Sequence, residues 1–549
     1  MKRLARAGVA LAIALLSPSA RAGGFEIPDN GTEALGRGGA FVAKADDPTA
    51  IQYNPAGLAQ QRGTRVLLDG HLMLSSYSFQ RYGAFPDNPN DAKTPWGGQP
   101  YPKVQDTGGP FFAPFIAATS DFGLDWLTAA IGVFGPSGVG NRTYPLGVDG
   151  APAASRYDVV QTSSLIALPT AAVGVKVFDW LDLGAAVHFV YGSFSLTSTS
   201  FVDIATAACP NVEYQPCDSV SRLDVKGTGW AGTLGALVHA SPNLTIGASV
   251  RTPISIDASG SATVLTAPLG QSIPPPGNAT FHTDLPLYAR AGARLAFRDD
   301  DGFEAGDVEL DGTYETWGTA QALGPTIHID HLGPSGPAFD DINVKVAHAY
   351  NDTYSIRGGG AFNTKLGFGV LTLRAGAYYD RSATAQNPGY TRLDFDTLDK
   401  IAGTVGVGLR WHGLLFNLGY AEVFEPDRTV YQGDGQLRPI DGAQHGAPVD
   451  ANGNLLPPVN QGVFSGHTEI ISFGVVATLD DLFGWKHDAP KGHETEKKEQ
   501  KPRDDEAPAP KAAPRDEEAS AAHAAAAAKA APPGPPRRKA LAKKSDWDD

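Results

Sequence analysis

Two neighbouring stretches of the chain carry charges of opposite sign at alternate positions. The arginines are Arg290, Arg294 and Arg298, and the acids are Glu309, Asp311 and Glu315. Folding the chain about the acidic turn at 299–303 places Arg294 opposite Glu309, with Arg290 on the diagonal from the other two acids. A guanidinium binds a carboxylate through two parallel hydrogen bonds, so these arginines can pair with the facing acids or with the carboxylate of a bound molecule. We favour the first interpretation, in which the charges brace the two segments.

The sequence lacks the common residue combinations that support catalysis. There is no GxSxG in a strand context and no HExxH, and alternation places no serine beside a histidine. We therefore predict no catalytic residue, no metal site and no cofactor, and we do not expect an enzyme. The net charge of −15 also argues against nucleic acid as a partner and against an anion-selective pore.

Alternating apolar and polar residues predict the β-strands that position these charges. In segments 371–379 and 471–479 the odd positions carry Leu, Ile, Phe, Val, Ala or Tyr, and the even positions are mainly small or polar. This pattern fits a strand with one face toward lipid and the other toward a wet lumen. No window of about 18 residues is both apolar and free of charge, so no transmembrane helix is predicted.

The predicted strands number fourteen, and the connections between them alternate in length. We place the strands at 64–80, 110–119, 124–135, 159–178, 181–197, 222–240, 243–258, 283–298, 304–320, 342–363, 366–380, 398–411, 414–424 and 467–479. Long connections such as 81–109 and 425–466 alternate with tight turns such as 179–180 and 412–413. This layout is typical of outer-membrane barrels, whose long loops face outside the cell. The predicted fold class is therefore all-β, a 14-stranded antiparallel transmembrane β-barrel.

Residues 1–22 have the three parts of a secretory signal peptide. A basic start is followed by the apolar run 9–16 and by Ala20-Arg21-Ala22, which forms an A-x-A cleavage site. The apolar run is too short to span a bilayer, which argues against the alternative of an N-terminal membrane anchor. The mature chain is expected to begin at about Gly23.

The chain has two cysteines, Cys209 and Cys217, in the predicted outer loop 198–221. Two cysteines eight positions apart in an exported protein indicate a disulfide that closes a small loop. A metal site would need more ligands nearby, and none of the 13 histidines clusters with the cysteines. We interpret the predicted disulfide mainly as a stabiliser of this loop.

Residues 23–59 form a segment of a different kind, between the signal peptide and the first predicted strand. The segment contains seven glycines and no long apolar run, so it reads as a compact plug that is mostly neither helix nor strand. Its successive motifs GRGGAFVA and ADDPTAIQYNPAGLA, directly behind a signal peptide, resemble the N-terminal hatch of the FadL/TodX family of outer-membrane transporters. Stretches such as AAIGVFGPSGVG (129–140) and NDTYSIRGGGAF (351–362) extend the resemblance over about residues 23–485.

The resemblance implies an architecture and a mechanism. A barrel formed by residues 60–486 would be closed by the hatch, residues 23–59. Long-chain fatty acids or other hydrophobic compounds would be captured by the outer loops, released by a rearrangement of the hatch, and passed sideways into the membrane through a kink in the third strand. A general diffusion porin and a structural outer-membrane protein are the alternative functions.

The resemblance also implies which residues act in gating and in lateral exit. The gating set is Asn54, Pro55, Ala56 and Gly57, and the kink set is Gly132, Phe134, Gly135, Pro136 and Gly138. Proline cannot donate a ladder hydrogen bond and glycine permits a bulge, so strand pairing should weaken at the kink set. The simpler interpretations are that Gly135-Pro136 ends the strand and that the Asn54 turn only joins the hatch to the first strand.

Residues 487–549 are rich in Lys, Glu, Ala and Pro and have no aromatic residue before Trp547. Such a composition cannot bury a core, so we predict a disordered tail. The tail would hang in the periplasm because the last predicted strand ends on that side. The protein is expected as a monomer in the outer membrane of a Gram-negative bacterium. Its expected partners are hydrophobic small molecules, outer-membrane lipid and the barrel-assembly machinery.

Overall fold

The computed structural model describes most of the chain between residues 30 and 484. The described residues are 30–135, 141–201, 209–268, 270–320, 325–330, 342–394, 396, 398–440 and 454–484. The predicted signal peptide and the predicted C-terminal tail lie outside them, as do Pro136 and Gly138 of the predicted kink. None of the helices in the described ranges has the length and apolar character needed to cross a membrane.

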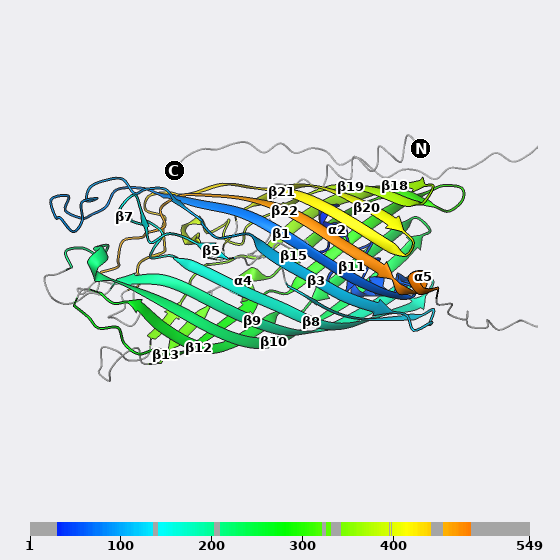
Figure 1. Ribbon diagram of the computed structural model, residues 1–549, viewed down its shortest axis with the longest axis horizontal. Coiled ribbons are helices and arrows are strands. Elements are labelled where there is room, and N and C mark those ends of the chain that lie inside the picture. The colour runs from blue at the N-terminus through cyan, green and yellow to red at the C-terminus, as the bar shows by residue number, and fades with distance from the viewer. Residues whose placement is uncertain are drawn as a thin grey trace, which may run out of the picture. The chain divides into compact units, whose positions relative to one another are not determined.

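Within the described residues, fourteen antiparallel strands form a closed barrel (Figure 1). In chain order they are β1 (Thr64–Arg81), β3 (Phe111–Ser120), β4 (Leu127–Phe134), β8 (Gln161–Phe178), β9 (Leu181–Phe201), β10 (Asp218–Ser241), β11 with β12 (Leu244–Arg251 and Ile254–Thr266), β13 with β14 (Gly277–Leu285 and Tyr288–Arg298), β15 (Glu304–Glu315), β18 (Thr353–Leu366), β19 (Gly369–Asp380), β20 (Lys400–Trp411), β21 (Leu414–Val430) and β22 (Gly462–Thr478). The last strand pairs with the first, from Arg65 opposite Thr478 to Arg81 opposite Gly462, and this seam closes the barrel. The predicted fold class is confirmed.

Alternation along the strands explains the two faces of the wall. In β20 the side chains of Ile401, Val405 and Val407 are about half exposed on the outer face, whereas Ala402 and Thr404 between them are buried. Large apolar side chains on the outside suit contact with lipid, and small or polar side chains on the inside leave room for whatever fills the lumen. The strand periodicity of the sequence therefore reports directly which face each residue occupies.

Two predicted strands, 243–258 and 283–298, are each broken near a proline. The break between β11 and β12 falls at Pro253, and the break between β13 and β14 begins at Pro286. A proline has no N–H to donate to the ladder, so pairing is interrupted at these points. The wall nevertheless stays continuous, because β10 pairs with both β11 and β12.

The predicted strands 304–320 and 342–363 differ from the observed ones. β15 ends at Glu315 and is followed by the short helix α4 (Trp317–Ala320). Residues 342–345 form a separate strand, β17 (Ile342–Lys345), which pairs with β16 (Thr326–Ile329), and β16 pairs with β13. Because residues 342–345 alternate in the same way as a barrel strand, periodicity alone does not separate this hairpin from β18.

The remaining short elements lie in the hatch, in the long connections and after β22. They are α2 (Thr32–Leu35), α3 (Ala50–Tyr53), η1 (Pro55–Gln60), β2 (Val104–Gln105), β5 (Arg142–Thr143), β6 (Gly147–Val148), β7 (Ala151–Pro152), η2 (Gln215–Cys217), η4 (Pro388–Tyr390) and α5 (Leu479–Phe483).

The described part of the hatch, residues 30–59, lies inside the barrel. Its helix α2 contacts β20, β21 and β22, and η1 contacts β8, β9 and β10, which belong to a distant part of the ring. A segment of this length reaches both sides of a closed wall only by crossing the lumen. All its side chains are buried except that of Asp46, so the hatch fills the space that it crosses.

Candidate functional site

The hatch is held to the wall by a buried ion cluster centred on Arg37. The Nη2 atom of Arg37 lies 2.7 Å from Oδ2 of Asp307 and 3.2 Å from Oε2 of Glu309, both on β15. All three side chains are fully buried. Removing one partner of a buried ion pair leaves an uncompensated charge and is strongly destabilising. The contacts with Asp307 and Glu309 therefore anchor Arg37, and with it the hatch, at this position.

The acids of β15 also bind the backbone of the hatch. Oδ2 of Asp311 accepts hydrogen bonds from the N–H groups of Phe41 and Val42, at 2.8 and 3.0 Å. Oε1 of Glu309 accepts from the N–H groups of Ala43 and Lys44, at 2.6 and 3.3 Å. Four consecutive backbone donors that no hatch helix uses are thus satisfied by two side chains of the barrel wall.

The arginines predicted to face these acids have other partners. The register is as predicted, with Arg294 opposite Glu309, but the Arg294 side chain pairs with Asp307 at 2.7 Å and with Glu304. Arg290 donates to the carbonyl of Gln52 in the hatch at 3.1 Å. Arg294 therefore braces β14 against β15 through acids other than the predicted ones, whereas Arg290, Glu309 and Asp311 hold the hatch. Glu315, at the end of the strand, accepts a hydrogen bond from the indole of Trp317.

A second ion cluster holds the start of the hatch on the same part of the wall, because β19 is separated from β15 only by β18. Glu33 in α2 lies 3.0 Å from Nη2 of Arg374 on β19 and 3.1 Å from Nζ of Lys44. The N–H of Gly38 donates to the hydroxyl of Thr404 on β20 at 2.9 Å. Glu33 and Arg37 were not singled out from the sequence. The signal available was that both are charged residues in a short, glycine-rich plug, where a charge needs a partner on the wall.

The predicted gating residues lie where the hatch meets the wall. The Asn54 side-chain N–H donates to the carbonyls of Val42 and of Ala236 on β10, and its Oδ1 accepts from the N–H of Ala56. Asn54 therefore joins two parts of the hatch to one strand of the barrel. Pro55 and Ala56 pack against Gly184 of β9, where an added Cβ would lie 2.1 Å from the carbonyl carbon of Pro55.

The third strand, β4, ends at Phe134, directly before Gly135 of the predicted kink, and the side-chain amide of Asn30 donates to the Gly135 carbonyl at 2.6 Å. Among the described residues, β4 pairs with β8 as far as Phe134 opposite Leu168, and β5 pairs with β8 from Arg142 opposite Thr162. Gly132 lies within the paired part of the strand.

The disulfide residues lie in the long connection before β10. A disulfide joins Cys209 and Cys217, and Cys217 ends the short helix η2. Cys217 packs with Tyr157, Phe201 and Tyr214 in a small apolar cluster of the long loops. The disulfide therefore ties the loop to a packed part of the long-loop end.

A cavity of about 280 Å³ lies at the long-loop end, between the wall and the loops. Its apolar lining includes Leu196, Leu223, Ile327, Val344, Val346 and Leu437. Two cations on its wall differ in their partners. Arg392 pairs with Asp158 and Asp394, whereas the buried Nε of Arg438 has no hydrogen-bond partner and no carboxylate contacts Arg438 within the described ranges.

A closed β-barrel whose lumen is crossed by a charge-anchored hatch is an architecture that suits an outer-membrane transporter. The chain belongs to the family of outer membrane protein transport proteins (OMPP1/FadL/TodX), whose model matches residues 13–455. The members of this family are transporters, and this protein is an outer-membrane transporter of hydrophobic compounds of the FadL/TodX type. No curated protein matches the chain.

Solved structures of transporters share the fold. A Pseudomonas aeruginosa FadL homologue is 18% identical, with a TM-score of 0.62, over 84% of this chain and 100% of that chain. The P. putida toluene transporter TodX is 14% identical, with a TM-score of 0.57, over 82% and 99%. The Ralstonia pickettii toluene transporter TbuX is 16% identical, with a TM-score of 0.54, over 82% and 99%. At these identities the similarity establishes the fold.

Proposed function

We propose that this transporter takes up long-chain fatty acids by passive capture in the outer cavity, hatch rearrangement and lateral release. The observation that carries the choice of ligand is Arg438. An apolar cavity whose wall holds a guanidinium that no carboxylate of the described residues contacts suits a molecule with an apolar chain and an anionic head. A neutral hydrocarbon would fill the apolar part of the cavity but would offer no negative charge to the guanidinium of Arg438. A general diffusion porin is disfavoured by a lumen that the hatch crosses.

Replacing Arg438 with methionine tests the proposed ligand. We expect the affinity of the purified protein for a long-chain fatty acid to fall about 10- to 100-fold, the value of one charge-assisted hydrogen bond. The affinity for a neutral alkane of the same length should not change, because the apolar lining remains. Binding is measured by titration calorimetry in detergent micelles.

The matched control is Arg222→Met. Arg222 also lines the cavity, but its guanidinium is paired with Asp224, 2.8 Å away, on the exposed side of β10. This variant should bind both ligands as the native protein does. Equal losses for the fatty acid and the alkane in Arg438→Met, or no loss at all, would reject the proposal that Arg438 receives the carboxylate.

The proposed exit lies at Gly135 and Pro136, directly after the end of β4. Among the described residues, pairing between β3 and β4 covers Ile116 to Ser120 of β3. In a closed barrel, a proline that has no N–H for the ladder, next to a glycine that permits a bulge, is the easiest place for the wall to open. The gating set around Asn54 lies on the hatch, and its movement would connect the lumen with this exit.

Replacing Gly135-Pro136 with Val-Thr should close the proposed exit. Both new residues can pair in the ladder, so we expect uptake of a labelled fatty acid to fall several-fold while thermal stability of the barrel holds or rises. Uptake is measured in cells that carry equal amounts of folded variant. The control is Gly403→Val, on the outer face of β20 with nothing near an added Cβ. Unchanged uptake in the Val-Thr variant would favour a route through the lumen to the periplasm.

We further propose the organisation of the rest of the chain. Residues 1–22 would be removed on export, residues 23–59 would act as the hatch, and residues 487–549 would lie in the periplasm as a flexible tail. The working unit would be a monomer, inserted by the barrel-assembly machinery. The composition of the tail supports the absence of a packed domain there, and it offers no basis for a specific role.

A further inference from the structure

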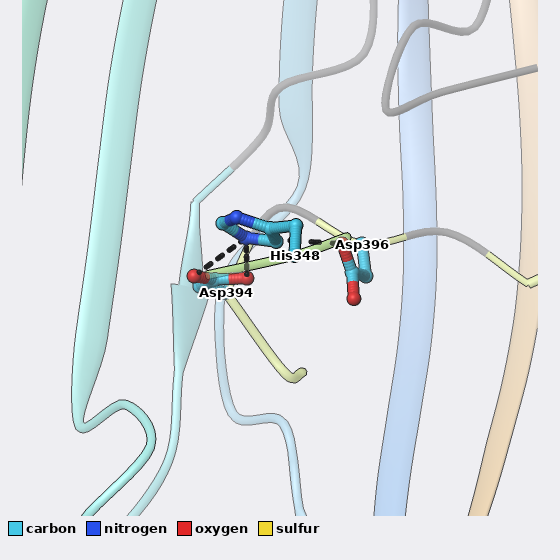
Figure 2. A group of neighbouring side chains, drawn as sticks. All are labelled: His348, Asp394 and Asp396. Carbon is cyan, nitrogen blue, oxygen red and sulfur yellow. Dashed lines mark hydrogen bonds and ion pairs between the residues drawn. The ribbon is translucent and has the colours of Figure 1, made fainter. Parts of the chain in front are cut away.

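The side chains of His348, Asp394 and Asp396, from two separate connections, converge (Figure 2). His348 lies between β17 and β18, and Asp394 and Asp396 lie between η4 and β20. The Nε2 atom of His348 is 3.1 Å from both carboxylate oxygens of Asp394 and 3.8 Å from Oδ1 of Asp396. One ligand-type atom from each residue lies within 4.8 Å of the other two, and all three side chains are about 1% exposed.

These separations match the ligand spacing around a single small cation. Zinc bonds of about 2.0–2.1 Å in a tetrahedral site place neighbouring ligand atoms roughly 3.3 Å apart. The observed nitrogen–oxygen distances of 3.1 and 3.8 Å lie on either side of that value. The donor set of one imidazole and two carboxylates is one that zinc accepts, with a fourth position left for water.

Each of the three side chains is oriented by an outer hydrogen bond. The Nδ1 atom of His348 lies 2.8 Å from the carbonyl of Val346, which keeps the proton on Nδ1 and directs Nε2 toward the carboxylates. Oδ1 of Asp396 accepts from the hydroxyl of Tyr350 at 2.6 Å, and Nε of Arg392 donates to Oδ2 of Asp394 at 3.0 Å. Metal-binding histidines and carboxylates are held in this way by a second layer of partners.

The charges around the group are unbalanced. Arg392 lies 3.0 Å from both Asp158 and Asp394, so the three carboxylates of Asp158, Asp394 and Asp396 together with this guanidinium carry −2 when His348 is neutral. Buried charges in proteins are paired or coordinate metals, and a divalent cation among the carboxylates would neutralise this excess.

We propose that His348, Asp394 and Asp396 form a zinc site in the outer loops. The site stands on its own geometry and does not depend on the ligand of the cavity. It shares a wall with that cavity, because Val346, Asp158 and Arg392 line the cavity and also contact the three ligands or their partners. Zinc would therefore hold the connection before β18 against the connection before β20, and would set the shape of the cavity wall. The importance of zinc for the shape of the cavity wall rests on the proposed function.

The test uses full-length protein purified in detergent without a polyhistidine tag, which would itself bind zinc. After treatment with a chelator, the protein is equilibrated with buffered zinc, and bound metal is counted by mass spectrometry. We expect one equivalent of zinc, with nitrogen and oxygen neighbours at about 2.0–2.1 Å and imidazole scattering in the X-ray absorption spectrum. Asp394→Asn and His348→Gln should each lower the affinity at least tenfold.

The matched control is His282→Gln. His282 also contacts two acids, Asp257 and Asp284, at the long-loop end, but it is about half exposed and lacks the enclosed geometry. This variant should bind zinc as the native protein does. Equal zinc binding by the native protein and the Asp394→Asn variant, or no stoichiometric zinc in native protein that is folded by circular dichroism, would overturn the proposal and leave the group as a buried ion pair.

A separate measurement tests the effect on the cavity. Fatty acid affinity is compared between zinc-loaded and chelator-treated native protein, and we expect the loaded form to bind at least threefold more tightly. If zinc binds stoichiometrically but neither zinc nor Arg438→Met changes fatty acid affinity, the proposed ligand fails and the metal site stands. If Arg438→Met weakens binding but no zinc is retained, the metal site fails and the proposed ligand stands.

Discussion

Replacing Arg37 with methionine should release the hatch and make the barrel leaky. The substitution leaves Glu309 buried without the Arg37 guanidinium and leaves Asp307 with Arg294 as its remaining cation, and breaking a buried pair in this way costs about 3–5 kcal/mol. That cost falls on the docked state, because the two acids regain water when the hatch moves away. We expect frequent open events and a higher mean conductance in planar bilayers, together with faster entry of a small hydrophilic antibiotic into cells.

The control for this prediction is Lys365→Met, which breaks the pair with Asp299. Both of those side chains are about half exposed, so the expected cost is only about 0–1 kcal/mol, and conductance should not change. Arg37→Lys keeps the charge and loses the planar fork, so an intermediate conductance is expected. A native-like, closed barrel in the Arg37→Met variant would mean that the backbone contacts to Glu309 and Asp311 suffice to hold the hatch.

Replacing Gly359 with valine should displace the hatch without changing any charge. Gly359 faces inward on β18, and an added Cβ would lie 2.0 Å from the carbonyl oxygen of Arg37. Gly376 on β19 is equally close to the hatch backbone, at 2.3 Å from the carbonyl carbon of Arg37. Since the obstructing atoms are backbone, neither side can yield by a rotamer change, and we expect overpacking to open the channel as Arg37→Met does.

The comparison for Gly359→Val is again Gly403→Val, where an added Cβ meets nothing within 4 Å. Both variants should insert as barrels with the same circular dichroism, because valine favours strands. The two variants are then distinguished by the access of a protease to the hatch, measured by mass spectrometry of the released fragments. If the hatch of Gly359→Val stays as resistant as that of the control, close packing at β18 does not determine where the hatch sits.

The features that follow from local periodicity could be predicted from the sequence. Strand number, the seam between the first and last strands, and the register that sets Arg294 opposite Glu309 all depend on alternation and on turn length. The predicted strand boundaries are wrong where a proline removes a backbone hydrogen-bond donor, as at Pro253. They are also wrong where a loop hairpin alternates like a barrel strand, as at residues 342–345.

The partners of the charged residues could not be predicted in the same way. Asp311 faces inward, as predicted, but periodicity does not say that hatch N–H groups will meet it there. The hatch is irregular, so neither its path nor its contacts follow from a repeat. The His348 group is a similar case, because Asp394 lies 46 positions away in another irregular connection. Such groups depend on how loops fold over one another, which a single sequence does not encode in any local pattern.

The distance along the chain between Arg37 and its anchor has a consequence for assembly. Asp307 lies 270 positions after Arg37, so the hatch is synthesised long before the strand that holds it exists. Contacts of such long range form late and slowly. Once β1 has joined β22, a charged hatch can enter the lumen only through an end of the barrel and no longer through the wall. The order in which the seam closes and the hatch reaches β15 therefore decides which route the hatch can take.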